Sequence, residues 1–503
     1  MSLVDYRQDF RPGIFKINQN ILKAFEKVDI RILLFLILCI NFLSFTVSDN
    51  EEAQLSLAKQ FMDHAWMPNS FSFNEWPGNR FLFQMLSGFA LRYVEFEPFV
   101  FFARMLVFLF ISIPLGAIFR KLGIKNIYAL IFFQIYLLHQ SYFGAEFIFR
   151  DYETKSLAYI FVLSGVYCLL NNKFLLAVFS SIIACYIHVL VGAGFFVLVF
   201  IYTIFRSKSF TLILKELLLF TVLFLPQGYF LGREIFSSGS VVNGVNIDWV
   251  YAYFRNPHHT TPLSVKGMRT EVILQMSITG LLFLSTLFIF RRFRGEFLDK
   301  LYTMNVIVFS ILFISVGISL IDKTGFILKF YLFRIAALGC FLMLLYTILM
   351  LKLIPAIPEL IKSLLFVSGF CLIIAAANTT FHQIFRADPK PGFHELVNYI
   401  KQNTGPEDVF LTMGDYELSF SRKTRRDEFV VYKFVPFGGK KIYEWYIRML
   451  ERMKLWDDLS EINYLKKKYR LNYFLCDHDV DEGQYLKLVF HNKTYSLYKI
   501  LGN

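Results

Sequence analysis

Two clusters of charged residues directly follow apolar segments of this sequence. The first contains Asp49, Glu51 and Glu52 and comes after an apolar run over residues 30–47. The second reads Arg150-Asp151-Tyr152-Glu153-Thr154-Lys155 and ends a later apolar run. Charged groups near hydrocarbon need water, a partner, a metal or a substrate. We expect both clusters to lie on the same side of a membrane and to form one site.

The carboxylates of these clusters suit proton transfer or cation binding. Asp49 is the best candidate for a general base, with Glu51 or Glu52 as substitutes, because helix ends are placed only to within a few residues. Asp151 and Glu153 are suitably spaced to hold a divalent cation such as Mg²⁺ or Mn²⁺ from a non-helical turn. The structural alternatives are a helix cap at residues 49–52 and a salt-bridged turn at residues 150–155.

The composition defines an integral membrane protein. Of 503 residues, 56% are hydrophobic and 18% aromatic, and the mean hydropathy of +0.49 is too high for a soluble protein. The six cysteines show neither metal-ligand spacing nor a disulfide framework. The net charge of +13 comes from Lys and Arg at the ends of apolar runs, which indicates membrane topology and no nucleic-acid partner.

The apolar runs predict about eleven membrane helices. They cover residues 30–48, 97–119, 127–147, 155–171, 173–188, 190–206, 211–230, 272–290, 301–321, 328–351 and 361–381. The pair that meets at residues 188–190 is short, and one re-entrant hairpin is the alternative to two spans. His139 and His188 lie on apolar helices, where a packing role is expected.

The basic connections predict the orientation. Every second connection between the predicted helices carries Lys, Arg or Asn, and by the positive-inside tendency these connections are expected to be cytoplasmic. They are residues 1–29, 120–121, 171–173, 206–208 and 291–294. The N-terminal stretch does not look like a cleavable signal. The transmembrane domain then covers residues 30–381, with outer loops at 49–96 and 232–270. This predicts a multi-pass protein of the cell (inner) membrane, with its C-terminal domain outside.

The first outer loop contains two predicted amphipathic helices. Residues 51–66 and 79–93 both carry apolar side chains at helical spacing, and the Pro- and Gly-containing segment between them predicts a turn. Such helices are expected to lie at the membrane surface.

Residues 382–503 have the composition of a soluble domain. Alternating patterns predict helices at 393–403, 443–453 and 459–469 and strands at 408–412, 429–432, 473–475 and 495–498, which together indicate a small α/β domain. It lacks a Gly-rich phosphate motif, a nucleophile elbow and a zinc pattern. The charge run at residues 421–427 is expected to be a solvated face, with Arg422, Arg425 and Arg426 available to anionic headgroups.

The layout resembles the GT-C superfamily of polytopic glycosyltransferases, which use polyprenyl-phosphate-linked sugars. The resemblance rests on acidic residues after the first helix, the long outer loop, the Asp151-Tyr152-Glu153 triplet and the soluble tail. The triplet is similar to the second acidic motif of oligosaccharyltransferase-like members, and Asp49 stands where their first-loop acidic residue does. The tail has no Trp-Trp-Asp-type signature, so the resemblance does not imply protein N-glycosylation.

The resemblance implies sugar transfer from a polyprenyl-phosphate donor to a glycan, lipid or protein acceptor on the outer face. Such transfer needs a base near the acceptor, stabilisation of the departing phosphate and a dry pocket. Candidates for phosphate binding are the cations of the turn and of later segments: Arg150, Lys155, Arg255, His258, His259 and Arg334. For the histidines a plain surface role is the alternative, and Arg334 has snorkelling to the interface as its alternative.

Other classes of membrane protein fit less well. A polysaccharide polymerase or ligase also binds polyprenyl-linked sugars through outer arginines, but the two acidic clusters and the soluble tail favour the glycosyltransferase interpretation. A transporter would show matching interrupted helices in two halves, and no convincing repeat is present. A non-enzymatic scaffold is a further alternative, with the tail as a binding module.

Overall fold

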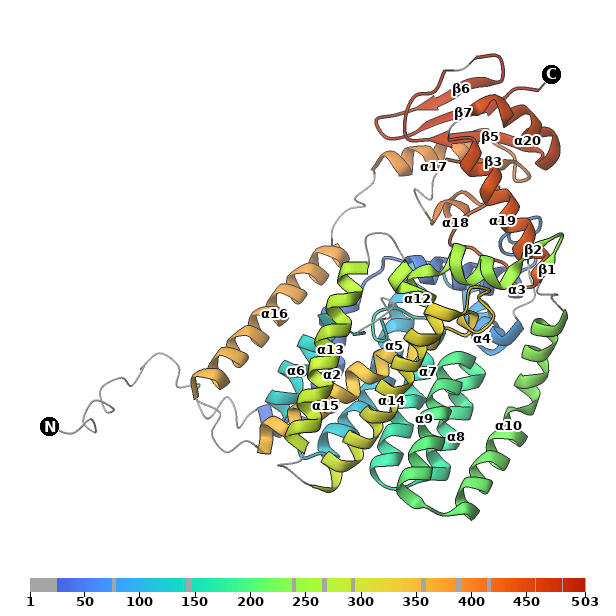
Figure 1. Ribbon diagram of the computed structural model, residues 1–503. Helices are drawn as coiled ribbons and strands as arrows, with labels where there is room; N and C mark the ends of the chain where they lie inside the picture. Colours follow the sequence, from blue (N-terminus) through green and yellow to red (C-terminus); the bar gives the residue numbers. More distant parts are fainter. Residues whose placement is uncertain are drawn as a thin grey trace.

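The computed structural model describes residues 25–74, 78–138, 140–141, 147–237, 241–264, 269–290, 295–353, 359–385, 391–413, 418–456, 458–481 and 483–502. Most of the N-terminal arm, His139 and the basic run at 291–294 therefore lie outside the described residues. In Figure 1 a bundle of long helices occupies the lower part of the molecule and a small sheet domain stands above it.

Each of the predicted membrane segments forms a helix. They are α2 (Ile30–Phe42), α5 (Phe96–Lys121), α6 (Asn126–Leu138), α7 (Thr154–Leu170), α8 (Phe174–Ile187), α9 (Val189–Ser207), α10 (Phe210–Ser237), α13 (Arg269–Phe290), α14 (Glu296–Ile321), α15 (Ala336–Leu353) and α16 (Glu359–Phe385). A break at His188 separates α8 from α9. Short helical turns, η5 (Leu328–Phe330) and η6 (Leu332–Ile335), precede α15.

The bundle has the surface of a membrane protein. Among the described residues, five helical segments are long and apolar enough to cross a bilayer: α5, α9, most of α10, α14 and the stretch 328–351. Helix α5 buries Ile111, Leu115 and Phe119 inside the bundle, whereas Phe102 and Phe110 of the same helix are exposed. A large apolar side chain on an outward face is stable against lipid and costly against water. The chain is thus a polytopic α-helical membrane protein.

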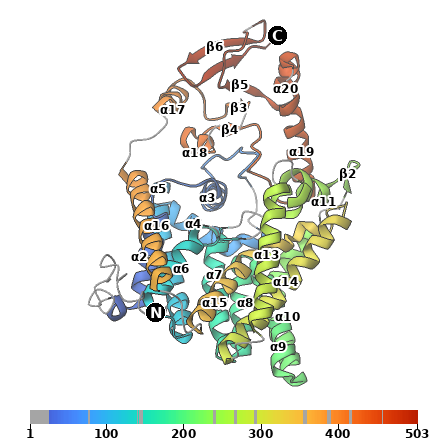
Figure 2. The same ribbon diagram turned by 60° about the vertical axis from the view of Figure 1, so that its left-hand side comes forward.

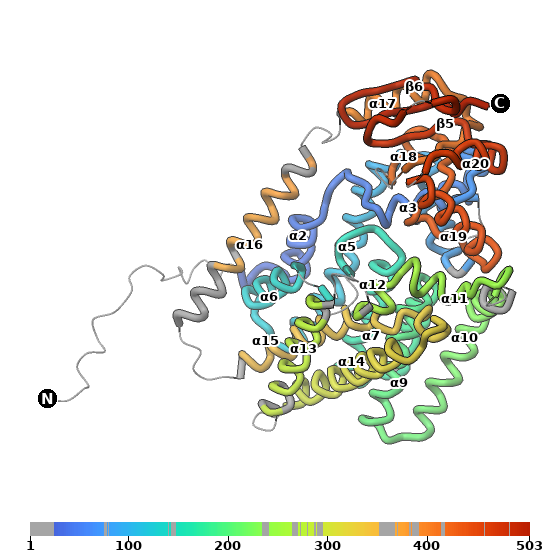
Figure 3. Tube along the Cα trace, turned by 45° about the horizontal axis from the view of Figure 1, so that its top comes forward, coloured from blue at the N-terminus to red at the C-terminus, as the bar shows by residue number. Residues whose placement is uncertain are grey.

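Helix α16 forms one edge of the bundle. It packs against α2 and α6, on the side opposite α10, as Figure 3 shows. It runs up toward the C-terminal domain and ends a few residues later than the sequence pattern predicts.

The first outer loop lies between the bundle and the C-terminal domain (Figure 2). It contains the two predicted helices, α3 (Asp49–Met62) and α4 (Phe81–Leu91), the latter preceded by the turn η2 (Gly78–Arg80). The helices touch closely at Gly88, where an added Cβ would stand 2.0 Å from the carbonyl oxygen of Ala58. Any larger residue at position 88 would separate the two helices.

The long outer loop after α10 is also structured. It forms a hairpin of β1 (Val241–Val242) and β2 (Val245–Asn246), followed by α11 (Ile247–Trp249), the π-helical turn η3 (Val250–Arg255), α12 (Pro257–Thr260) and the turn η4 (Pro262–Ser264). This series of short elements lies at the outer end of the bundle, below the C-terminal domain in Figure 1.

The C-terminal domain is the expected small α/β unit. Its sheet has the order β4-β3-β5-β7-β6, parallel at the β4–β3 and β3–β5 pairs and antiparallel at the other two. The strands are β3 (Val409–Thr412), β4 (Asp427–Glu428), β5 (Leu471–Cys476), β6 (Leu486–His491) and β7 (Ser496–Ile500). The helices are α17 (Pro391–Asn403), α18 (Phe420–Thr424), α19 (Gly439–Lys454) and α20 (Ile462–Tyr469), with the turn η7 (Leu459–Glu461) before α20.

The strand predicted at residues 429–432 is wrong. The last backbone bond to β3 is made by the N–H of Phe429, which donates to the carbonyl of Phe410 at 2.8 Å. Beyond it, side chains of α19 take the place of a neighbouring strand: Arg452 donates to the carbonyl of Val430 at 3.1 Å and Trp445 Nε1 to that of Val431 at 3.0 Å. The apolar side chains of this run are buried. Strand β6 was not predicted.

Candidate functional site

A large cavity lies where the bundle, the two outer loops and the C-terminal domain meet. Its volume is about 2550 Å³, well above the roughly 300–1,000 Å³ of a typical small-molecule pocket. Ten of the eleven residues predicted for the site line it: Asp49, Glu52, Arg150, Asp151, Glu153, Lys155, Arg255, His258, His259 and Arg334. Glu51 does not. The two clusters therefore converge, as expected, although their chemical roles stay predictions.

Asp49 is not the cap of the helix that it begins. Ser48 caps α3, because its Oγ accepts the N–H of Glu51 at 3.4 Å and Glu51 Oε2 accepts the N–H of Ser48 at 2.8 Å. The side chain of Asp49 is exposed and lines the cavity. No residue in the described ranges forms a hydrogen bond or ion pair with its carboxylate. The helix-capping role considered for Asp49 is thus filled by Ser48 and Glu51.

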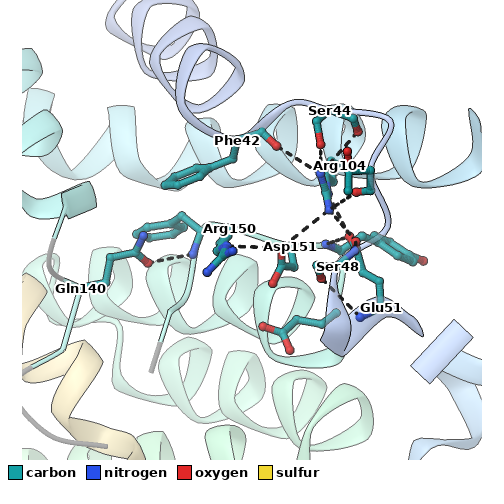
Figure 4. Close-up of polar contacts among 12 residues, drawn as sticks. Phe42, Ser44, Ser48, Glu51, Arg104, Gln140, Arg150 and Asp151 are labelled. Atoms are coloured by element: carbon teal, nitrogen blue, oxygen red, sulfur yellow. Dashed lines mark hydrogen bonds and ion pairs between the residues drawn. The ribbon is translucent and has the colours of Figure 1, made fainter. Parts of the chain in front are cut away.

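Glu51 is part of a buried hydrogen-bond network. It is fully buried, and its carboxylate accepts from Arg104 Nε at 2.9 Å and from the N–H of Tyr152 at 2.7 Å (Figure 4). Arg104 of α5 also donates to the Ser44 hydroxyl at 2.9 Å and lies 3.7 Å from Asp151. This network joins the end of α2, the start of α3 and the second acidic cluster. Glu51 therefore fits poorly as a substitute base.

Sequence reasoning missed Arg104. The available signal was a single guanidinium inside the apolar segment that forms α5, where a charged group requires a buried partner. Which carboxylate provides that partner could not be read from the sequence.

Glu52 forms an ion pair with an arginine of the C-terminal domain. Arg422 of α18 donates to both Glu52 oxygens at 2.7 and 2.8 Å and to Glu97 at 2.8 Å. Burial alone would lower the pKa of Arg422, but the hydrogen bonds that it donates to Glu52 raise this pKa above its ordinary value. The expected solvated face at residues 421–427 is thus wrong for Arg422, which helps to join the two domains.

The second acidic cluster is a tightly bonded turn. Glu153 lies 3.1 Å from Lys155 Nζ and 3.5 Å from Gln54 Nε2, while Gln54 Oε1 accepts the N–H of Thr154 at 3.2 Å. Asp151 lies 3.9 Å from Arg150 as well as near Arg104. These ion pairs show that the turn is salt-bridged, as the structural alternative expects. Its residues still line the cavity.

The acidic turn is a poor fit for a divalent cation. Within the described residues no group of three or more His, Cys, Asp or Glu side chains is arranged to hold a metal ion. Asp151 and Glu153 both lie beside cations. The Mg²⁺ or Mn²⁺ site stays a prediction.

The predicted cations approach the cavity from the long outer loop and from the start of the α15 region. Arg255 donates to Asn256 Oδ1 at 3.2 Å and to the carbonyl of Lys433 at 3.2 Å. Arg334 lies 4.6 Å above the ring of Tyr331 and bonds His188 Nε2. His188, expected only to pack, also caps α9 through Nδ1. Its place at the cavity wall was not predicted.

The neighbouring histidines contact each other with their rings tilted by 46°. The ring centroids of His258 and His259 lie 4.0 Å apart, and His259 lies 5.9 Å from the ring of Tyr331. Both line the cavity, so the plain-surface alternative does not describe them.

Arg80 and Lys433 are among the further cations that line the cavity and were not predicted. Arg80, just before α4, lies 5.4 Å from the ring of Phe437, and burial lowers its pKa. Lys433 comes from the C-terminal domain, and burial together with nearby Arg255 lowers its pKa. In the part of the chain that the structure describes, neither forms an ion pair with a carboxylate. The signal for Arg80 was an isolated cation beside an apolar helix, whereas Lys433 had no local signal.

Comparisons with known proteins add little about function. A family described as "Domain of unknown function (DUF6798)" matches residues 392–451, within the C-terminal domain. No curated protein matches the sequence. Among solved structures, the chain is similar to ArnT from Cupriavidus metallidurans bound to undecaprenyl phosphate, with 12% identity and a TM-score of 0.49 over 96% of this chain and 98% of that chain.

Proposed function

We propose that this protein is a membrane glycosyltransferase that moves a sugar from a polyprenyl-phosphate-linked donor to an acceptor on the outer face of the membrane. The observation that carries the proposal is one large cavity lined by Asp49, Arg80 and Lys433, whose charged groups form no ion pair with any residue that the structure describes. A base and a phosphate-binding set are the two groups that such a transfer requires.

The proposed reaction uses these groups in one displacement. Asp49 takes the proton of the acceptor as the acceptor atom attacks the anomeric carbon of the sugar. The bond between that carbon and the donor phosphate breaks, and the phosphate leaves with the electron pair. Cations of the cavity, Arg80, Arg255 and Arg334 among them, stabilise the negative charge that develops there.

The test is a transfer assay with a polyprenyl-phosphate sugar and purified full-length protein in vesicles. Asp49→Asn should reduce turnover by roughly 10²-fold or more, the usual contribution of a general base. Its unfolding midpoint and donor binding should not change, since Ser48 caps the helix. Asp63→Asn, at the other end of α3, is the matched control. Unchanged turnover in folded Asp49→Asn would remove Asp49 from the chemistry.

Asp151 has a different proposed role. It lies near both Arg104 and Arg150 and so fixes the charges around the donor phosphate. Asp151→Asn should weaken donor binding more than it lowers the maximal rate, which separate measurements of affinity and turnover would show. A pure rate effect would instead place Asp151 among the reacting groups.

The orientation belongs to the same proposal. The basic connections predict that the N-terminus is cytoplasmic and that the C-terminal domain and the cavity face outward. A cysteine at position 440, on exposed Lys440, should react with a membrane-impermeant reagent from the outside in a background without the native cysteines. Labelling only from the cytoplasmic side would reverse the topology.

A further inference from the structure

One segment of the C-terminal domain forms a wall of the cavity. In residues 431–438, Val431 and Phe434 are buried against the first outer loop, and the Phe434 ring lies 4.9 Å from that of Phe73. Trp445 holds the carbonyl of Val431 from the opposite side. Lys433 lies between these anchors and lines the cavity. Its position is therefore fixed by both domains.

The long outer loop places a second cation beside Lys433. The guanidinium of Arg255 lies 4.8 Å above the ring of Tyr432 and donates to the carbonyl of Lys433 at 3.2 Å. The Tyr432 hydroxyl donates in return to the carbonyls of Phe254 at 2.8 Å and Arg255 at 2.9 Å. These reciprocal bonds hold the Arg255 segment against residues 432–433 across the domain boundary, and Arg255 is near enough to lower the pKa of Lys433.

The charge of this pair has no directly contacting counter-charge among the residues that the structure describes. No described carboxylate forms an ion pair with Arg255 or Lys433, although Asp49 and Glu153 are near enough to act on Lys433 electrostatically. The Nε of Arg255 is buried and, among the described residues, has no hydrogen-bond acceptor. A buried donor without an acceptor and two adjacent cations are both costly. An anion with several oxygens would remove both costs at once.

We propose that Arg255 and Lys433 form a binding site for one phosphate group, shared between the long outer loop and the C-terminal domain. The planar guanidinium suits two phosphate oxygens, and the Lys433 ammonium adds a mobile donor. Phosphate binding then strengthens the docking of the C-terminal domain, because each domain supplies one of the two cations. This inference goes beyond the proposed transfer in giving the C-terminal domain a residue that contacts the ligand.

The test measures binding and does not depend on transfer. Full-length protein in detergent is titrated with undecaprenyl phosphate and, separately, with inorganic phosphate. Lys433→Gln should weaken binding on the order of tenfold, as expected for the loss of one charge-assisted hydrogen bond, while Lys433→Arg should retain most of it. Lys440→Gln, a nearby exposed lysine on α19, is the matched control and should bind like the wild type.

A second readout reports on the domain boundary. Ligand should slow amide hydrogen exchange over residues 429–438 in the wild type and in Lys440→Gln, but much less in Lys433→Gln. An effect on undecaprenyl phosphate identifies a lipid phosphate as the ligand, whereas an effect on inorganic phosphate alone identifies a free or acceptor phosphate.

The inference and the proposed function can fail separately. Wild-type protein that binds neither probe, or folded Lys433→Gln that binds both with wild-type affinity, would overturn the shared phosphate site. Intact phosphate binding in a protein that transfers no sugar would overturn the glycosyltransferase function only.

Discussion

The carboxylates in the first turn of helix α3 have two opposite environments. Glu51 and Glu52 are buried and held by Arg104 and Arg422, whereas Asp49, from the same run of residues, lines the cavity and has no ion-pair partner among the described residues. The cations divide in the same way, because carboxylates neutralise Arg104 and Arg422, whereas no carboxylate that the structure describes forms an ion pair with Arg80. Neutralised charges hold elements together. Uncompensated charges in a cavity remain available to a ligand.

The largest stability effect is expected at Arg104. Arg104→Met leaves the fully buried Glu51 without its counter-charge, and removal of one partner of a buried ion pair costs about 3–5 kcal/mol. Thermal unfolding in detergent should show a clear drop in midpoint. The double variant with Glu51→Gln should recover much of the loss, since no unpaired charge then remains. A double variant as unstable as the single one would show that the pair is not the cause.

A smaller loss is expected at the boundary between the domains. Arg422→Gln leaves Glu52 buried and unpaired, while Glu97, which is more exposed, can turn to water. We expect a lower unfolding midpoint and faster hydrogen exchange in α18. Arg425→Gln, an exposed neighbour, provides the control. Equal exchange in both variants would mean that Arg422 does not hold the domain in place.

The smallest effect concerns pH at Asp427, which accepts the N–H of Phe71 at 3.2 Å. Burial raises the pKa of Asp427 to about 6, against the opposing hydrogen bonds of Ser70 and Phe71. The folded state therefore holds this proton more tightly than the unfolded state, whose pKa is about 4. Stability from this group is present below about pH 4 and is lost as the pH rises to about 6.

The measurement compares the unfolding midpoints of the wild type and Asp427→Asn from pH 4 to 7. The advantage of the Asn variant should grow up to about pH 6 and then level off, whereas exposed Asp481→Asn should show no such trend. A constant difference across this range would contradict the raised pKa.

The membrane helices were predictable because their signal is local. A long apolar run has one stable arrangement in a bilayer, so its length and flanking residues already define the helix. The convergence of the clusters at Asp49 and Asp151 was also predictable, since both follow apolar segments on the same expected side of the membrane. The two helices of the first outer loop followed in the same way from their apolar spacing.

The pairing of charges was not predictable, because it depends on contacts between distant parts of the chain. Nothing near Glu52 in the sequence indicates Arg422, and nothing near Lys433 indicates Arg255. The same reason explains the wrong strand at residues 429–432, where an apolar pattern typical of a strand packs against the first outer loop and is bonded by side chains of α19. At these residues, tertiary contacts outweighed the local preference for a β-strand.

The division between neutralised and available charges is tested most directly by one pair of variants, Arg80→Gln and Arg422→Gln. Undecaprenyl phosphate binding and the unfolding midpoint are measured for both. We expect Arg80→Gln to weaken binding on the order of tenfold and to leave the midpoint unchanged, because a cavity cation loses only its ligand contact. Arg422→Gln should lower the midpoint. An Arg80→Gln protein that is destabilised like Arg422→Gln yet binds undecaprenyl phosphate as tightly as the wild type would contradict the account.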